Sequence, residues 1–99
     1  MKIRVVEIMM KLIDEIEKKL RNDLNPIEFD IWDESEEHKG HAGATDGARH
    51  FFLRVVSYKF STLNRVQRHK LVYGILDGYI PKKIHALSVK AIAPEELKL

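Results

Sequence analysis

The chain has 99 residues, of which 44% are hydrophobic and 32% are charged, and it contains no cysteine. This length suits one domain with one hydrophobic core, so we expect a single domain over residues 1–99. The composition is that of a folded globular protein, not of a disordered one. Without cysteine the chain cannot form disulfides, use a thiol in catalysis, or build a zinc finger or an iron–sulfur centre by itself.

The net charge is +2, but the two halves of the chain differ in sign. Residues 1–50 carry eight Lys and Arg against twelve Asp and Glu, and residues 51–99 carry nine against three. Either the folded surface is bipolar or the charges intermix on folding. No stretch reaches the ~20 apolar residues of a membrane span, and the N-terminus does not look like a signal peptide. We expect a protein without membrane contact, in a bacterial cytoplasm or in a mitochondrial matrix or plastid.

The first half of the chain predicts a helix, a strand, a long loop and a second strand. Apolar residues at steps of three and four indicate an amphipathic helix over residues 3–22, and Asn25-Pro26 ends it. Alternation over residues 27–32 indicates a half-buried strand. Residues 34–49 contain three glycines and many polar side chains, and loops of such length are often functional. Residues 51–56 form the second strand, the hairpin partner of the first.

The second half predicts a helix and a third strand. Residues 61–64 form a turn or helix cap, and an apolar stripe that begins at Val66 and includes His69 marks a helix closed by Gly78 and Pro81. Residues 84–91 form a strand parallel to the second one, reached by a right-handed crossover. Residues 94–97 begin a short helix. The order α-β-β-α-β(α) predicts an α+β fold, with a three-stranded mixed sheet and helices on one face.

Three of the five histidines are candidate metal ligands. His38 and His41 lie three apart in the glycine-bearing loop, which could carry an imidazole to a metal; the alternative is a solvated surface pair. His85 stands in the apolar run of the third strand, either as a ligand held by a second hydrogen bond or as a packed strand histidine. For His50 and His69 we expect structural, hydrogen-bonded roles, and for Arg68-His69 an anchor for the second helix or a contact with a partner.

Several short pieces, in order and at matching spacings from about residue 7 to Glu96, resemble the BolA family. They are Asp33-Glu34-Ser35, the His38/His41 loop, His50-Phe51, Val56-Ser57 with Phe60, Val66 with Arg68-His69 and Val72-Tyr73, and Ile84-His85-Ala86-Leu87-Ser88. One position departs from the family pattern. Such proteins usually have a glycine two residues after the phenylalanine, where this chain has Thr62, so a tight turn with positive φ is in doubt there.

The resemblance implies a fold similar to type II KH domains and a partnership with monothiol glutaredoxins. In such pairs a [2Fe–2S] cluster is bridged by a cysteine of the glutaredoxin and by glutathione, and the BolA-like chain adds the histidine of its third strand and a residue of its long loop. Here these would be His85 and either His41 or His38. The work would be iron–sulfur cluster assembly, trafficking or iron regulation, with the free protein a monomer or weak dimer.

The sequence also bears on two other function classes, nucleic-acid binding and catalysis. Some family members are described as DNA-binding transcriptional regulators, and a basic surface would serve this role through Arg65, Arg68, His69, Lys82 and Lys83. The one Gly-x-x-Gly sequence, residues 40–43, lies between strands and not between helices, and Phe29, Phe51 and Trp32 are explained by the sheet, so sequence-specific RNA binding is not expected. No catalytic motif is present, and we expect no enzymatic activity.

Overall fold

A computed structural model describes residues 5–33, 50–80 and 86–97 of the chain. Its helices are α1 (Val5–Leu24) and α2 (Arg65–Ile75), and its strands are β1 (Glu28–Asp33), β2 (His50–Val56) and β3 (Ala86–Ile92). Two short 3₁₀ helices, η2 (Tyr58–Phe60) and η3 (Pro94–Glu96), follow β2 and β3. None of the helices in these ranges is long and apolar enough to cross a membrane.

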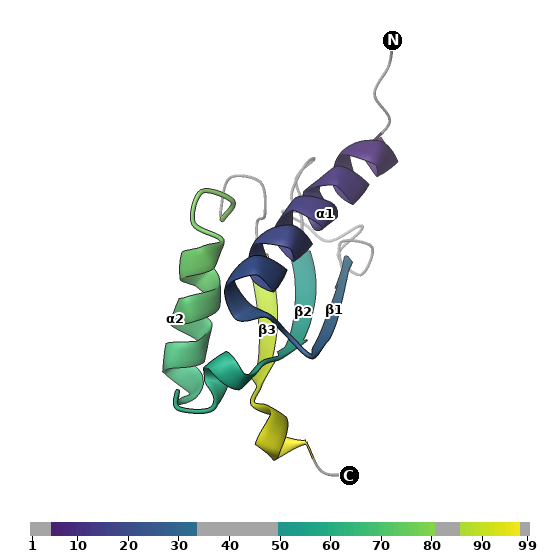
Figure 1. The fold of residues 1–99 in the computed structure, drawn as a ribbon. Coiled ribbons are helices and arrows are strands. Elements are labelled where there is room, and N and C mark those ends of the chain that lie inside the picture. Colours follow the sequence, from purple (N-terminus) through teal and green to yellow (C-terminus); the bar gives the residue numbers. More distant parts are fainter. Residues whose placement is uncertain (1–4, 34–49, 81–85, 98–99) are drawn as a thin grey trace.

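The three strands form one mixed sheet in the order β1-β2-β3. β1 pairs with β2 antiparallel, and β2 pairs with β3 in parallel, as a hairpin followed by a helical crossover requires. Both helices lie on the same face of the sheet, and its other face carries no helix among the described residues (Figure 1). The predicted α+β arrangement, with a mixed sheet and helices on one face, is therefore confirmed.

The core lies between the helices and the inward face of the sheet. Side chains alternate along β2, so that Phe51, Leu53 and Val55 are fully buried while His50, Phe52 and Arg54 are only partly buried; Val56, the last residue of the strand, is also fully buried. The two helices, the strand β3 and the segments that follow α2, β2 and β3 complete the core with Ile16, Leu20, Leu24, Phe60, Val72, Leu76, Leu87 and Ala93. Burial of this apolar surface is the main source of stability for the domain.

The inward stripe of α2 differs from the predicted one. Val66 is exposed, and so is His69, although both were assigned to the apolar stripe. Val72 and Leu76, which were assigned to the same stripe, are buried as predicted. Arg68 lies four residues before Val72 and therefore on the same inward side of the helix. A half-buried arginine thus occupies the place where an apolar residue was expected. The helix also ends at Ile75, earlier than the residues Gly78 and Pro81 that were predicted to close it.

The turn before α2 has Thr62 at the position where BolA-like proteins usually have a glycine. Among the described residues, φ is positive only at Asn25, which follows α1, and at Gly78. Thr62 therefore adopts an ordinary backbone conformation. The predicted cap is confirmed: the side chain of Asn64 accepts a hydrogen bond from the backbone N–H of Gln67, and the Gln67 side chain accepts one from the N–H of Asn64.

Candidate functional site

At one end of the sheet lie the strand ends to which the segments with the candidate ligands are joined in the sequence. β1 ends where β2 and β3 begin, because β1 is antiparallel to β2 and β3 is parallel to it (Figure 1). At this end Asp33 pairs with Phe51, and His50 pairs with Ala86. We call this end of the strands, defined by Asp33, His50 and Ala86, the loop edge. It lies at the upper end of the strands in Figure 1.

The predicted metal ligands His38, His41 and His85 lie outside the described residues. Their positions in the sequence are nevertheless fixed relative to the loop edge: His85 directly precedes Ala86, and the other two belong to the segment that joins Asp33 to His50. Within the described ranges, no group of three or more His, Cys, Asp or Glu side chains could hold a metal ion.

His50 is the one loop-edge histidine that the structure describes. It is half-buried, and its Nε2 lies 3.3 Å from the hydroxyl oxygen of Ser88 on the neighbouring strand. This contact agrees with the structural role that we expected for His50.

The outward face of the sheet carries an aromatic pair that sequence reasoning missed. The rings of Trp32 and Phe52 stack with centroids 4.5 Å apart. Trp32 lies in the sheet as expected, but it is 45% exposed, whereas we expected no exposed aromatic ring. The two residues are register partners on β1 and β2. Strand alternation could have predicted the outward position of Trp32, because Phe29 and Ile31 face inward and Trp32 is the next residue after Ile31.

Arg68 fastens α2 to β3 and to the chain after it. Its guanidinium donates hydrogen bonds to the carbonyl oxygens of Leu63 (2.9 Å) and Ala91 (3.2 Å) and forms an ion pair with Glu96 at 2.6 Å. Its side chain is 13% exposed. The hydrogen bond from Arg68, aided by one from the backbone N–H of Ala93, holds the pKa of the Glu96 carboxyl below its ordinary value. The anchoring role expected for this arginine is therefore seen in the structure.

His69 does not face the core. Its ring stacks on Tyr73 with centroids 4.2 Å apart, and the Tyr73 hydroxyl donates a hydrogen bond of 2.7 Å to the carbonyl oxygen of Leu87 in β3. The exposed imidazole of His69 is thus held on the side of α2 next to β3 by a ring that is itself fixed to the sheet. Ring stacking, and not the hydrogen bond that we expected, is the contact that the structure gives to His69.

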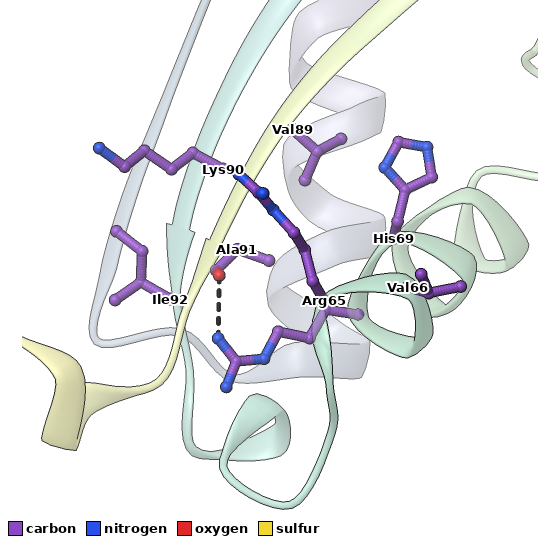
Figure 2. A pocket seen from close by; sticks show the side chains of 8 residues that line it. Arg65, Val66, His69, Val89, Lys90, Ala91 and Ile92 are labelled. Atoms are coloured by element: carbon purple, nitrogen blue, oxygen red, sulfur yellow. Dashed lines mark hydrogen bonds between the residues drawn. The ribbon is translucent and has the colours of Figure 1, made fainter.

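A groove of about 400 Å³ lies between the first turns of α2 and the strand β3 (Figure 2). We call it the α2–β3 groove, and it is lined by Arg65, Val66, Arg68, His69, Val89, Lys90, Ala91 and Ile92. In Figure 2 the side chain of Arg65 extends from α2 alongside β3. Arg65 and Lys90 form no hydrogen bond or ion pair with any other described residue, whereas Arg68 is neutralised by Glu96.

The groove brings together three of the residues predicted as a partner or nucleic-acid surface, namely Arg65, Arg68 and His69. The other two, Lys82 and Lys83, lie outside the described residues.

The second group with a shifted pKa is Tyr79, which packs against α1 and not in the groove. Burial raises the pKa of Tyr79, and so does its hydrogen bond of 3.2 Å to the Glu15 carboxylate.

Comparison with known proteins relates the chain to one family. The profile of the family described as BolA-like protein matches residues 20–96. The chloroplastic protein BOLA1 of Arabidopsis thaliana is 42% identical over 82 residues, which are 80% of this chain and 51% of that protein. SufE-like protein 1 of the same plant, named as chloroplastic and mitochondrial, is 39% identical over 87 residues, 83% of this chain but 24% of that protein. The chain thus spans about half or less of these two relatives.

The structure is similar to a solved relative as well. BolA1 from Arabidopsis thaliana superposes with a TM-score of 0.74 at 35% sequence identity, covering 86% of this chain and 94% of that one. A bacterial relative, from Haemophilus influenzae, is 33% identical over 89 residues, which are 90% of this chain and 84% of that protein. That relative is named a DNA-binding transcriptional regulator BolA.

Proposed function

We propose that this chain, which belongs to the BolA-like family, is a non-enzymatic adaptor that pairs with a monothiol glutaredoxin and helps to bind a shared [2Fe–2S] cluster. Its work would be iron–sulfur cluster assembly, trafficking or iron regulation. The observation that supports this best is the loop edge: the segment with His38 and His41 starts and ends there, and His85 precedes the strand that begins there.

The donor groups of the chain fit a shared cluster better than one of its own. The chain has no cysteine, so the thiolates must come from the glutaredoxin and from glutathione. This chain would supply His85 together with His41 or His38 as neutral imidazoles. Imidazoles in place of thiolates raise the reduction potential of such a cluster, and their protonation makes binding weaker in acid. Both properties suit a cluster that is passed on.

The ligand assignment predicts that His85→Ala abolishes formation of the cluster-bridged complex. The protein is mixed with a glutaredoxin carrying a [2Fe–2S] cluster, and the visible circular dichroism and gel-filtration profile are recorded. We expect the unsubstituted protein to change the spectrum and to co-elute with the cluster, and His85→Ala to do neither. Lys18→Ala is the control, because it truncates an exposed side chain of α1 and leaves every histidine in place.

The same measurement separates the two loop histidines. If His41 is the ligand, His41→Ala removes the spectral change and His38→Ala preserves it, and the reverse assigns His38. An unchanged spectrum and no complex with the unsubstituted protein would refute the proposal, and so would equal cluster binding by His85→Ala.

A second candidate function is DNA binding in transcriptional regulation. The cations of the α2–β3 groove support it, as does the name of the Haemophilus influenzae relative. Binding to a DNA duplex should then weaken as salt rises, and Arg65→Ala should lower the slope of log K against log salt by about 1. Lys11→Ala, on the exposed side of α1, serves as the control with equal loss of charge. An affinity that does not depend on salt would contradict this function, and His85→Ala should leave DNA binding unaltered.

A further inference from the structure

β3 is an edge strand whose outer polar groups face α2. The sheet order is β1-β2-β3, so within the described residues no strand lies beyond β3. The carbonyl oxygen of Ile92 accepts a hydrogen bond of 3.0 Å from the N–H of Ser57, which follows β2, so the polar groups of Ile92 point toward β2. Because successive residues of a strand alternate, those of Leu87, Val89 and Ala91 point to the open edge.

Side chains of α2 already occupy two of the three edge carbonyls. Arg68 donates to the carbonyl of Ala91, and Tyr73 donates to that of Leu87. Val89 lies midway between them and lines the α2–β3 groove. No side chain of the described residues hydrogen-bonds to the backbone of Val89. The open edge therefore has one short gap, centred on Val89, where a further chain could pair.

The groove around this gap combines aliphatic and cationic side chains. Val66, Val89 and Ile92 give it an apolar lining, and Val66 is 61% exposed. Arg65 brings positive charge from α2 and extends alongside β3, whereas the side chain of Lys90, which also lines the groove, extends away from α2 (Figure 2). A ligand that fits must offer an aliphatic group, a negative charge and backbone groups that can pair with a strand.

We propose that the α2–β3 groove binds a short extended segment of a partner protein, which pairs with the backbone of Val89 and places an aliphatic and an acidic side chain in the groove. Such strand addition obtains affinity from main-chain hydrogen bonds and specificity from alternate side chains. Because the carbonyls of Ala91 and Leu87 are already bonded, pairing is confined to about three residues of the partner. This inference goes beyond the cluster-binding function and does not depend on it.

The groove suits a peptide better than a nucleic acid. Single-stranded nucleic acids bind through aromatic rings on which their bases stack. Of the described side chains that line the groove, the one ring is His69, and one of its faces already stacks on Tyr73.

The test is a titration of the ¹⁵N-labelled protein with a capped pentapeptide that alternates glutamate with valine, followed by amide chemical shifts. We expect shifts at Val89 and at Arg65 and His69. Arg65→Ala should weaken binding about threefold, because an exposed ion pair contributes little. Lys70→Ala is the matched control, since it removes one exposed charge from the same helix outside the groove, and it should leave the affinity unchanged.

Backbone pairing is tested by methylating the amide nitrogen of the central valine of the peptide. Loss of one hydrogen bond should weaken binding about fivefold. The proposal is overturned if the methylated peptide binds equally well, if the Val89 amide does not shift, or if a single-stranded oligonucleotide binds the same amides more tightly than the peptide. Neither cluster nor glutaredoxin is present, and His85→Ala should bind the peptide like the unsubstituted protein, so failure here is distinct from failure of the proposed function.

Discussion

Replacing Phe51 by alanine is expected to remove about 3 to 5 kcal/mol of the unfolding free energy, as is typical for a buried phenylalanine. Phe51 is fully buried on the central strand β2, where it pairs with Asp33 on β1 and Leu87 on β3. Domains of this size have a total stability of about 5 to 15 kcal/mol. The variant should therefore unfold at a much lower urea concentration, with an unchanged slope against urea.

Phe52→Ala provides the matched control for Phe51→Ala. It removes the same side chain from the next position of β2, which lies on the outward face and stacks on Trp32. We expect this substitution to cost roughly 1 kcal/mol, since it loses an aromatic pair on the surface without leaving a cavity in the core. Equal losses for the two variants would show that the inward face of β2 does not carry the core.

Alternation and element order were enough to predict the sheet. Phe29 and Ile31 on β1, and Phe51 and Leu53 on β2, follow the period of two, and a helix between β2 and β3 favours parallel pairing. The stripe of α2 could not be predicted in the same way. Arg68 faces inward because its partners there are two carbonyl groups and a carboxylate. The spacing of apolar residues along α2 cannot predict these polar partners.

The candidate sites differ in how far the sequence predicts them. Histidines are visible as residue types, and the hairpin together with the parallel strand is enough to bring their segments to one edge. The α2–β3 groove depends instead on tertiary packing. Arg65 lies on α2 and Lys90 on β3, and only the docking of α2 by Arg68 and Tyr73 brings the two cations to the same groove. Their charge was noted in the sequence, but no local pattern connects them.

Arg68→Ala is the second substitution for which we expect a large loss of stability, about 2 kcal/mol at neutral pH. The guanidinium is 13% exposed and binds the carbonyls of Leu63 and Ala91 as well as Glu96, and hydrogen bonds to charged groups contribute more than neutral ones. Arg68→Lys retains the charge but cannot reach all three partners, because an ammonium lacks the fork of donors. Its loss should be intermediate, and urea unfolding measures both.

The ion pair with Glu96 makes part of this stability depend on pH. The pKa of Glu96 is held below its ordinary value of 4.5 in the folded protein, so the folded state favours the charged carboxylate. This contribution is complete above the ordinary pKa and disappears as pH falls through the lower, folded value. Glu96→Gln cannot titrate, so its deficit relative to the unsubstituted protein should be full at pH 7 and should shrink as pH falls below 4.5 and through the lower, folded pKa.

Arg68→Ala should behave differently from Glu96→Gln over the same pH range. It also loses the hydrogen bonds to Leu63 and Ala91, whose carbonyls do not titrate, so a deficit should remain in acid after the Glu96 contribution has gone. Urea unfolding of the three proteins at pH 7, 5 and 3 distinguishes the two components. If the deficit of Arg68→Ala disappeared in acid together with that of Glu96→Gln, the ion pair alone would dock α2. The carbonyls of β3 would then have no part in holding the helix beside the groove.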